Sequence, residues 1–154
     1  MDVKANYSST VQHQKAEADR QRERGDDRLY ISILRGKARN LMYRQNWQEV
    51  SLPEIVERFA PRASPIVKGN KIHYRSLDGA IDVLVDIGGG YLRIQDLKHS
   101  TRKRPEYLDL SGHNPRYVIV SGKKVRVLPP EQYNPITHFR IKHMLQIESP
   151  KHKS

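Results

Sequence analysis

The 154-residue sequence contains no cysteine, which excludes disulfide bonds, thiolate metal sites and a cysteine nucleophile. It also lacks any apolar run near the roughly 18 residues that a membrane-spanning helix needs. Residues 1–16 have no apolar stretch of the kind that a secretory signal peptide requires. Hydrophobic residues make up 36% of the chain, less than in an average globular protein but more than in a disordered one. We therefore expect one small domain that does not associate with membranes.

Positive charge is what the sequence has in excess. It holds 28 lysines and arginines against 17 aspartates and glutamates, a formal net charge of +11. Residues 66–154 carry 16 basic and 8 acidic side chains. Within this part, residues 93–126 carry nine basic and three acidic side chains. Such an excess concentrates phosphate polymers near the surface and speeds encounter with them. We expect a nucleic-acid partner. The alternative is a ribosome-like or merely soluble protein, since such proteins can also be basic.

The first third of the chain favours helices. Residues 11–24 are rich in helix-forming side chains but show no apolar stripe, so we expect residues 1–27 to be a polar helical or flexible extension. Apolar residues at helical spacing then predict a helix from residue 29 to residue 47. Ser51 and Glu54 have the spacing of a capping box, which predicts a second, shorter helix directly after Ser51.

From residue 66 the apolar period changes from helical to alternating. Gly88–Gly90 indicates a hairpin link rather than a phosphate-binding loop, because neither a Lys-Ser/Thr pair nor a helix follows it. We predict an α+β fold in which two or three N-terminal helices pack on an antiparallel sheet of four to six strands. We expect residues 28–148 to form this single domain, with residues 149–154 as a flexible basic tail. The predicted strands are 72–75, 81–87, 91–96, 107–110, 117–120, 125–128 and 136–141.

The alternation also predicts which side chains share a surface. One arrangement buries the apolar set of these strands under the helices and leaves the other face open and polar. Arginines on such a face neutralise phosphates and tyrosines stack on bases, so the face suits RNA. Its side chains would be Tyr91, Arg93, Gln95, Tyr107, Asp109, His138 and Arg140, and the basic loop at its edge would add Lys98, Arg102, Lys103 and Arg104 as further nucleic-acid contacts.

Cleavage of RNA by its own 2′-hydroxyl needs a base, an acid and fixed positive charge, and it requires no metal or other cofactor. His138 is the first candidate proton carrier, because histidine titrates near neutral pH. Arg93 or Arg140 would hold the phosphate, and Thr137 or Tyr107 would orient it. A solvated sheet face explains the same His–Arg alternation equally well.

The other histidines carry less weight. His73 is a second possible proton carrier, although a surface histidine is the simpler interpretation. His99 and His113 lie among turn-forming residues, so we expect solvent to surround them. No His-x-x-x-His pair on a helix supports a zinc site, and we predict no metal.

Three segments of the C-terminal half occur in a recognisable order: Tyr91–Asp96, Arg104–Gly112 and Tyr133–Phe139. This order resembles the toxin domains at the ends of bacterial polymorphic and contact-dependent inhibition proteins. Those domains belong to the barnase–EndoU–colicin–RelE-like group of metal-independent ribonucleases. The resemblance covers residues 66–141.

The resemblance implies helices on an antiparallel sheet whose open face carries the active site. The matching positions are Arg93, the loop near Lys98 and Arg104, Tyr107, Thr137 and His138. Two departures concern the loop: Leu97-Lys98-His99 stands where the family has a more Ser/Thr-rich loop, and Pro105 interrupts the step to Tyr107.

The resemblance further implies a toxin that is delivered to, or acts in, the bacterial cytoplasm. Its substrate would be tRNA, ribosomal RNA or messenger RNA, cut by transphosphorylation, and its protein partner would be an acidic immunity protein. Two other functions stay open: a non-catalytic nucleic-acid-binding module of a phage or mobile element, and a protein-interaction role in which the basic face docks an acidic partner.

Overall fold

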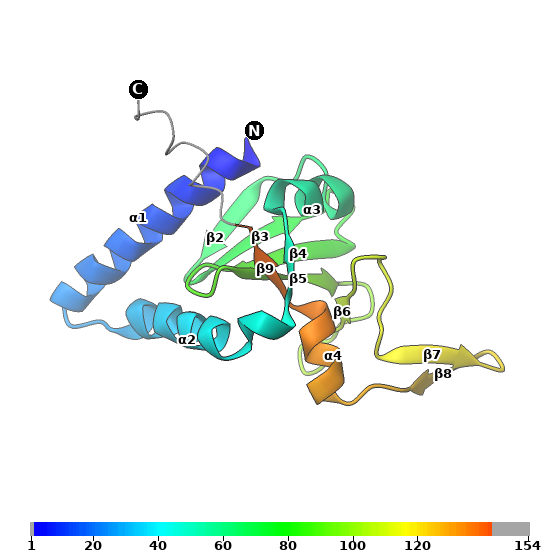
Figure 1. Ribbon diagram of the computed structural model, residues 1–154. Coiled ribbons are helices and arrows are strands. Elements are labelled where there is room, and N and C mark those ends of the chain that lie inside the picture. The colour runs from blue at the N-terminus through cyan, green and yellow to red at the C-terminus, as the bar shows by residue number, and fades with distance from the viewer. Residues whose placement is uncertain (1, 143–154) are drawn as a thin grey trace, which may run out of the picture.

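The computed structural model describes residues 2–142, in which helices pack on one face of a large sheet (Figure 1). The helices are α1 (Val3–Glu23), α2 (Arg28–Tyr43), the 3-10 helix η1 (Arg44–Asn46), α3 (Leu52–Phe59) and α4 (Pro130–Thr137). The strands are β1 (Gln48–Val50), β2 (Pro65–Lys68), β3 (Lys71–Arg75), β4 (Ile81–Asp86), β5 (Tyr91–Asp96), β6 (Tyr107–Leu108), β7 (Tyr117–Val120), β8 (Lys123–Arg126) and β9 (Phe139–Ile141).

Seven strands form the main sheet in the order β1-β9-β5-β4-β3-β2, with β6 paired to β5. The pairs β2–β3, β3–β4, β4–β5, β5–β6 and β5–β9 are antiparallel, whereas β1 pairs with β9 in parallel. Strands β7 and β8 form a separate two-stranded hairpin. The predicted α+β class, with N-terminal helices packed on the sheet, is confirmed, and the parallel pair makes the sheet mixed.

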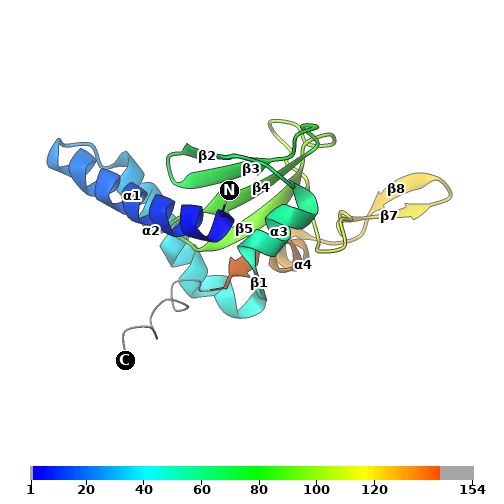
Figure 2. The same ribbon diagram turned by 90° about the horizontal axis from the view of Figure 1, so that it is seen from above.

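The core lies between one face of the sheet and the helices α1 and α3 (Figure 2). Alternate residues of β3, β4 and β5, such as Ile72, Val83 and Leu92, are fully buried there. From the opposite side, α3 contributes Leu52 and Phe59. Helix α3 begins as predicted, because the Ser51 hydroxyl accepts a hydrogen bond from the Glu54 amide at 3.5 Å.

Helix α1 is part of this domain and not an extension of it. Val3, Tyr7 and Val11 pack against the core, and burial raises the pKa of Tyr7 to about 12. These three residues are spaced by four and therefore form a short stripe on one side of the helix. The prediction considered residues 11–24, which lie beyond most of this stripe.

The last predicted strand, residues 136–141, begins later than expected. Ile136 and Thr137 belong to α4 and not to a strand, because Tyr133 and Thr137, four residues apart, bury one face of a helix. His138 follows as the C-cap with extended backbone, so the last strand begins only at residue 139. Strands β1 and β2 were not predicted; β1 finds its partner β9 some 90 residues away in the chain, a pairing that local patterns do not encode.

The glycines between β4 and β5 form a hairpin, as predicted, and bring α2 close to it. A Cβ atom on Gly36 of α2 would overlap the Asp86 carboxylate and lie 2.9 Å from the Gly89 nitrogen. A Cβ atom on Gly88 would overlap the Ile33 carbonyl group. The three glycines thus permit a backbone-to-backbone contact that places the C-terminal half of α2 beside the turn that joins β4 to β5.

None of the helices in residues 2–142 combines the length and apolar character that crossing a bilayer requires. The predicted tail, residues 149–154, and the last residues of the predicted domain lie outside the described residues.

Candidate functional site

The second face of the sheet carries polar side chains, in agreement with the alternation in the sequence. On β5, Tyr91, Arg93 and Gln95 point to this face, while Leu92 and Ile94 point into the core. The strand register completes the same surface: Tyr91 pairs with Arg140, and Gln95 lies between Asp82 and Tyr107. Helices α1 and α3 leave this face uncovered, whereas α2 and α4 border it (Figure 2).

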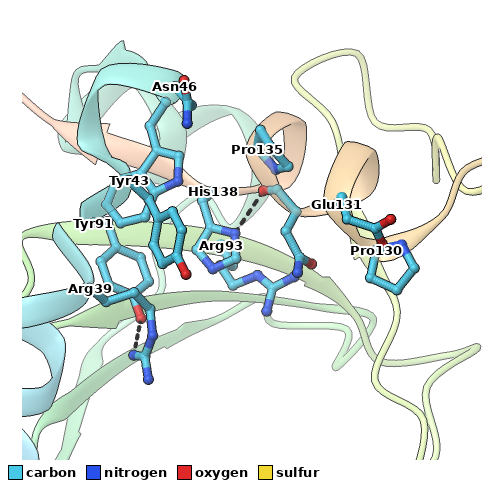
Figure 3. Close-up of a pocket in the computed structure, with 11 residues that line it drawn as sticks. Arg39, Tyr43, Asn46, Tyr91, Arg93, Pro130, Glu131, Pro135 and His138 are labelled. Carbon is cyan, nitrogen blue, oxygen red and sulfur yellow. Dashed lines mark hydrogen bonds between the residues drawn. The ribbon is translucent and has the colours of Figure 1, made fainter.

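A pocket of about 710 Å³ opens where α2, α4 and β5 meet (Figure 3). Its walls combine aromatic rings, two arginines and two amides, together with the exposed carboxylate of Glu131. This combination of ring faces and cations is suited to a nucleotide, which presents both a base and a phosphate. The lining residues are Arg39, Tyr43, Asn46, Trp47, Tyr91, Arg93, Pro130, Glu131, Asn134, Pro135 and His138.

His138 lies in the wall of this pocket and forms a cluster of three contacting rings with Trp47 and Tyr91. Its imidazole stacks on Trp47 with ring centroids 5.4 Å apart and an interplanar angle of 11°, and it is tilted against Tyr91 at 5.2 Å. The Nδ1 atom lies 2.7 Å from the Asn134 carbonyl oxygen. Because a carbonyl only accepts, Nδ1 carries the proton in the neutral ring, and Nε2 keeps its lone pair.

The protonation state of His138 follows from its surroundings. The side chain is 8% exposed, and burial, followed by the positive charge of Arg93, lowers its pKa to about 4. The imidazole is therefore neutral at pH 7. In this form it accepts a proton at Nε2 but has none to donate there.

Arg93 is a mostly buried cation that forms no ion pair with any residue of the described chain. Its Nη2 atom donates to the Thr137 hydroxyl at 3.3 Å, and the guanidinium lies 3.3 Å from the centroid of the Tyr107 ring. The Nε atom has no hydrogen-bond partner, and within residues 2–142 no carboxylate oxygen lies within 4.0 Å of the group. Burial lowers the pKa of Arg93. An uncompensated buried charge is costly, so this position favours an anion.

A second arginine reaches the pocket from α2. Arg39 Nη1 donates to the Tyr91 hydroxyl at 2.8 Å and lies 3.9 Å from Asp86. The buried Asp86 carboxylate also accepts from Asn70 Nδ2 at 3.0 Å and from the Gly89 amide at 2.8 Å. Asp86 therefore ties α2 to the β4–β5 hairpin and sets the position of Tyr91 in the pocket wall.

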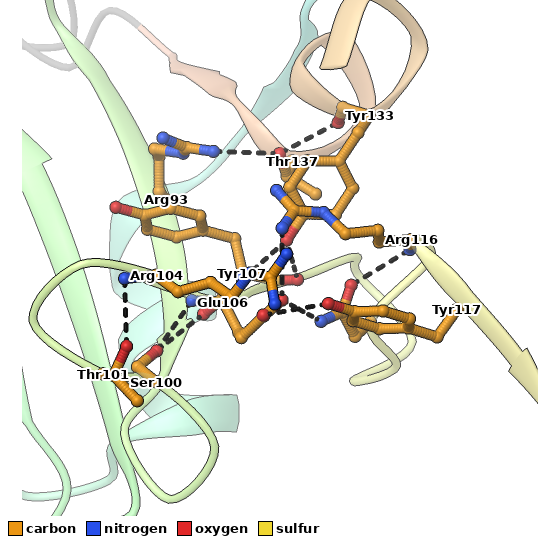
Figure 4. A network of polar contacts seen from close by, with 11 residues as sticks. Arg93, Ser100, Thr101, Arg104, Glu106, Tyr107, Arg116, Tyr117, Tyr133 and Thr137 are labelled. Carbon is orange, nitrogen blue, oxygen red and sulfur yellow. Dashed lines mark hydrogen bonds and ion pairs between the residues drawn. The ribbon is translucent and has the colours of Figure 1, made fainter. Parts of the chain in front are cut away.

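A second buried carboxylate, Glu106, directly precedes Tyr107 and holds the connection between β6 and β7 (Figure 4). It accepts hydrogen bonds from Asn114 Nδ2 at 2.7 Å and from the Tyr117 hydroxyl at 3.1 Å. Beside it, the Tyr133 hydroxyl accepts from the Tyr107 amide at 2.7 Å and donates to the Tyr107 carbonyl at 2.9 Å. These contacts hold the Tyr107 ring against Arg93.

The structure thus brings four predicted residues together: Arg93 contacts Thr137 and Tyr107, and it lines the same pocket as His138 (Figure 3). The predicted nucleic-acid contacts lie elsewhere. Arg140 is engaged with Glu49 at 3.2 Å and with the Trp47 carbonyl, and Gln95 is half-buried on the open face. The remaining four, Lys98, Arg102, Lys103 and Arg104, are exposed in the β5–β6 connection and do not line the pocket.

The other histidines of the described chain take different positions. His73 lies on the open face, where its Nδ1 atom is 2.7 Å from the buried Asp82 carboxylate. His99 is exposed, as expected, and pairs with Asp96 at 2.7 Å. Asp109, predicted on the polar face, instead caps a turn by accepting from the Ser111 and His113 amides.

Sequence reasoning missed Arg39, Tyr43 and Trp47. Arg39 and Tyr43 are one helical turn apart on α2, where they extend a polar side without any local motif. Trp47 is the only tryptophan of the chain, and a lone large aromatic is a usable signal for a pocket wall. Their meeting with His138 depends on the long-range pairing of β1 with β9.

Within residues 2–142, no group of three or more histidines, aspartates and glutamates is arranged to hold a metal ion. Comparison of the chain with protein-family models, curated proteins and solved structures finds no match.

Proposed function

We propose that this protein is a metal-independent endoribonuclease that cleaves RNA by transphosphorylation in the pocket around His138. One observation carries the proposal: the buried guanidinium of Arg93, which has no carboxylate partner in the described chain, lies beside a neutral imidazole. A phosphodiester supplies the missing anion, and its neighbouring 2′-hydroxyl supplies a proton for the imidazole to accept.

The pocket residues divide the reaction between them. Arg93 and Arg39 bind the scissile phosphate and stabilise the negative charge of the pentavalent phosphorane. His138 Nε2 takes the proton of the 2′-hydroxyl, and the 2′-oxygen forms a bond to phosphorus. The bond from phosphorus to the 5′-oxygen then breaks. The products are a 2′,3′-cyclic phosphate and a 5′-hydroxyl.

The leaving 5′-oxygen also needs a proton. The pocket lining contains no second histidine, so we assign this proton to the Tyr43 hydroxyl, which lies in the pocket (Figure 3), or to water. A Tyr43→Phe variant separates the two, because it slows cleavage only when the phenol donates.

An acceptor with a pKa of about 4 is a weak base in the empty pocket. The positive charge of Arg93 is one of the causes that lower the pKa of His138. A bound phosphate compensates this charge and therefore raises the pKa of His138. Substrate binding therefore strengthens the base at the moment when a proton is to be taken.

The aromatic rings restrict the form of the substrate. Trp47 and Tyr91 are almost fully buried and form the pocket wall, whereas Tyr43 is 46% exposed and has ring faces on which a base can stack. A base reaches them only when it is unstacked from its neighbours, so we expect cleavage in single-stranded regions and loops. In a protein of the toxin type that the sequence resembles, such RNA would be bacterial tRNA, ribosomal RNA or messenger RNA.

The test is incubation of the purified protein with total bacterial RNA in EDTA, beside the variants His138→Ala and His113→Ala. The proposal expects discrete fragments with 2′,3′-cyclic phosphate ends from the wild type. A general base contributes about 10²- to 10⁴-fold, so His138→Ala is expected to lose that factor. His113 is exposed and serves as the matched control.

A second candidate is a module that binds nucleic acid without cleaving it. The low exposure of His138 favours it, since a stacked and mostly covered ring also serves as a purely structural wall. This candidate expects salt-sensitive RNA binding and intact RNA after long incubation. Intact RNA with the wild type would overturn the ribonuclease proposal.

A further inference from the structure

The hairpin of β7 and β8 stands away from the rest of the domain (Figures 1 and 2). Among the strands that the structure describes, β7 and β8 pair only with each other. All of the hairpin's paired residues except Tyr117 are exposed, and its four large aliphatic side chains are between 43% and 64% accessible. These side chains are Val118, Ile119, Val120 and Val125. An isolated two-stranded hairpin is at best marginally stable in water, so this one gains from being covered.

The register collects the valines on one face. Val118 lies opposite Val125, and Val120, two residues along, points to the same side. Val127, two residues beyond Val125, extends this apolar face and is also exposed at 49%. No described element of the domain packs on it. Contiguous exposed apolar side chains on a projecting element mark an interaction surface.

The charges on the hairpin have one sign. Lys123, Lys124 and Arg126 all lie on β8, and within residues 2–142 none has a carboxylate oxygen within 4.0 Å. No aspartate or glutamate occurs between Asp109 and Glu131. Lysines on an edge strand disfavour pairing with another copy, because they bring like charges together. The complementary partner is acidic.

We propose that the β7–β8 hairpin docks an acidic protein partner, which adds a strand to a free edge of the hairpin and covers the valine face. Main-chain hydrogen bonds along the edge supply affinity, and alternate side chains supply specificity. RNA is the weaker occupant, because aliphatic β-branched side chains offer bases no stacking surface. This proposal stands apart from the ribonuclease activity and does not depend on it.

The base of the hairpin is anchored to the rest of the domain. Tyr117 donates to Glu106 at 3.1 Å, and the Arg116 guanidinium lies 4.1 Å from the centroid of the Tyr133 ring (Figure 4). The β7–β8 hairpin is therefore fixed to the domain at its base, while its outer part carries the apolar side chains and the cations. A hairpin that is fixed at its base and uncovered along its strands offers a partner strand a preformed edge, which lowers the entropic cost of binding.

The experiment measures binding of a fluorescein-labelled peptide of alternating glutamate and valine to the full chain by anisotropy. The variants are Lys123→Gln/Lys124→Gln/Arg126→Gln and, as a control with the same change in net charge, Arg102→Gln/Lys103→Gln/Arg104→Gln. A third variant, Val118→Thr/Val125→Thr, keeps β-branched side chains and removes the apolar face. We expect saturable binding that weakens at least tenfold in the hairpin variants and less than twofold in the loop variant.

Backbone amide exchange of the wild type provides the second readout, and the peptide is expected to slow exchange along β7 or β8. Absence of saturable binding, equal weakening in both charge variants, or a dimer formed by the free protein would each overturn the proposal. Tighter binding of a single-stranded RNA of equal length at the hairpin would assign the surface to RNA and overturn it as well. None of these measurements depends on RNA cleavage, so the docking proposal and the ribonuclease proposal can fail independently.

Discussion

The imidazole of His138 stacks on the indole of Trp47, with ring centroids 5.4 Å apart and planes within 11° of parallel. The two residues lie at the same end of the parallel β1–β9 pair, since Trp47 directly precedes β1 and His138 directly precedes β9. Both strands begin at the pocket, and β9 also pairs with β5, so these two pairings together place the tryptophan, the histidine and Arg93 side by side.

Stability is expected to fall on acidification because of His138. Its pKa is lowered in the folded state to about 4, whereas the unfolded value is near 6.5. Between these values the unfolded chain binds more protons, so stability is complete above pH 6.5 and is lost as the pH falls towards 4. The loss amounts to about 3 kcal/mol. Denaturant unfolding at pH 7 and pH 4.5 measures it against His138→Phe, which keeps a ring beside Trp47 and lacks the titration. An equal pH dependence in both proteins would contradict the role of His138.

Inorganic phosphate is expected to raise the pKa of His138. The anion would occupy the space beside Arg93 and compensate the charge that lowers this pKa. Titration of the imidazole signals by NMR, with and without phosphate, measures the shift. Arg93→Gln removes the cation and serves as the comparison, in which phosphate should leave the titration unchanged. An identical shift in this variant would show that phosphate acts elsewhere.

Replacing Arg93 with methionine is expected to separate stability from function. The guanidinium is buried without a counter-charge in the described chain, and an apolar side chain of similar length removes that cost. Unfolding measurements at pH 7 should show a gain of about 1 kcal/mol. The same variant should lose phosphate binding and RNA cleavage. A destabilised Arg93→Met protein would mean that the contacts with Thr137 and Tyr107 outweigh the burial of the charge.

Substituting Gly36 with alanine is expected to loosen α2 from the β4–β5 hairpin. The added Cβ atom would overlap the Asp86 carboxylate and crowd the Gly89 amide. Overpacking of this kind costs about 2 kcal/mol. Chemical denaturation gives the value, with Leu41→Ala on the exposed side of the same helix as a control expected to stay within about 0.5 kcal/mol. Because α2 carries Arg39, the Gly36 variant should also bind phosphate less tightly.

Much of the fold could be predicted from local patterns. The period-two alternation of residues 81–96 with three glycines between the halves is a hairpin signal, and the structure has β4 and β5 there. Ser51 and Glu54 also predicted the start of α3 correctly, because a helix cap depends only on residues that are neighbours in the chain. The end of the chain was harder: residues 130–137 contain two prolines and β-branched side chains, yet they form α4. There, burial of Tyr133 and Thr137 against the domain outweighs the weak intrinsic preference.

The sequence by itself determined the α+β class, the main hairpins and the polar face with Arg93 and Tyr107, because side-chain alternation is a local property of the backbone. Only the tertiary structure decided that Arg39, Trp47 and His138 share one pocket and that Arg93 is buried with no carboxylate of residues 2–142 beside it. These facts depend on the pairing of β1 with β9 and on the glycine contact of α2. Both join segments far apart in the chain, and their free energy comes from packing and burial that no local pattern records.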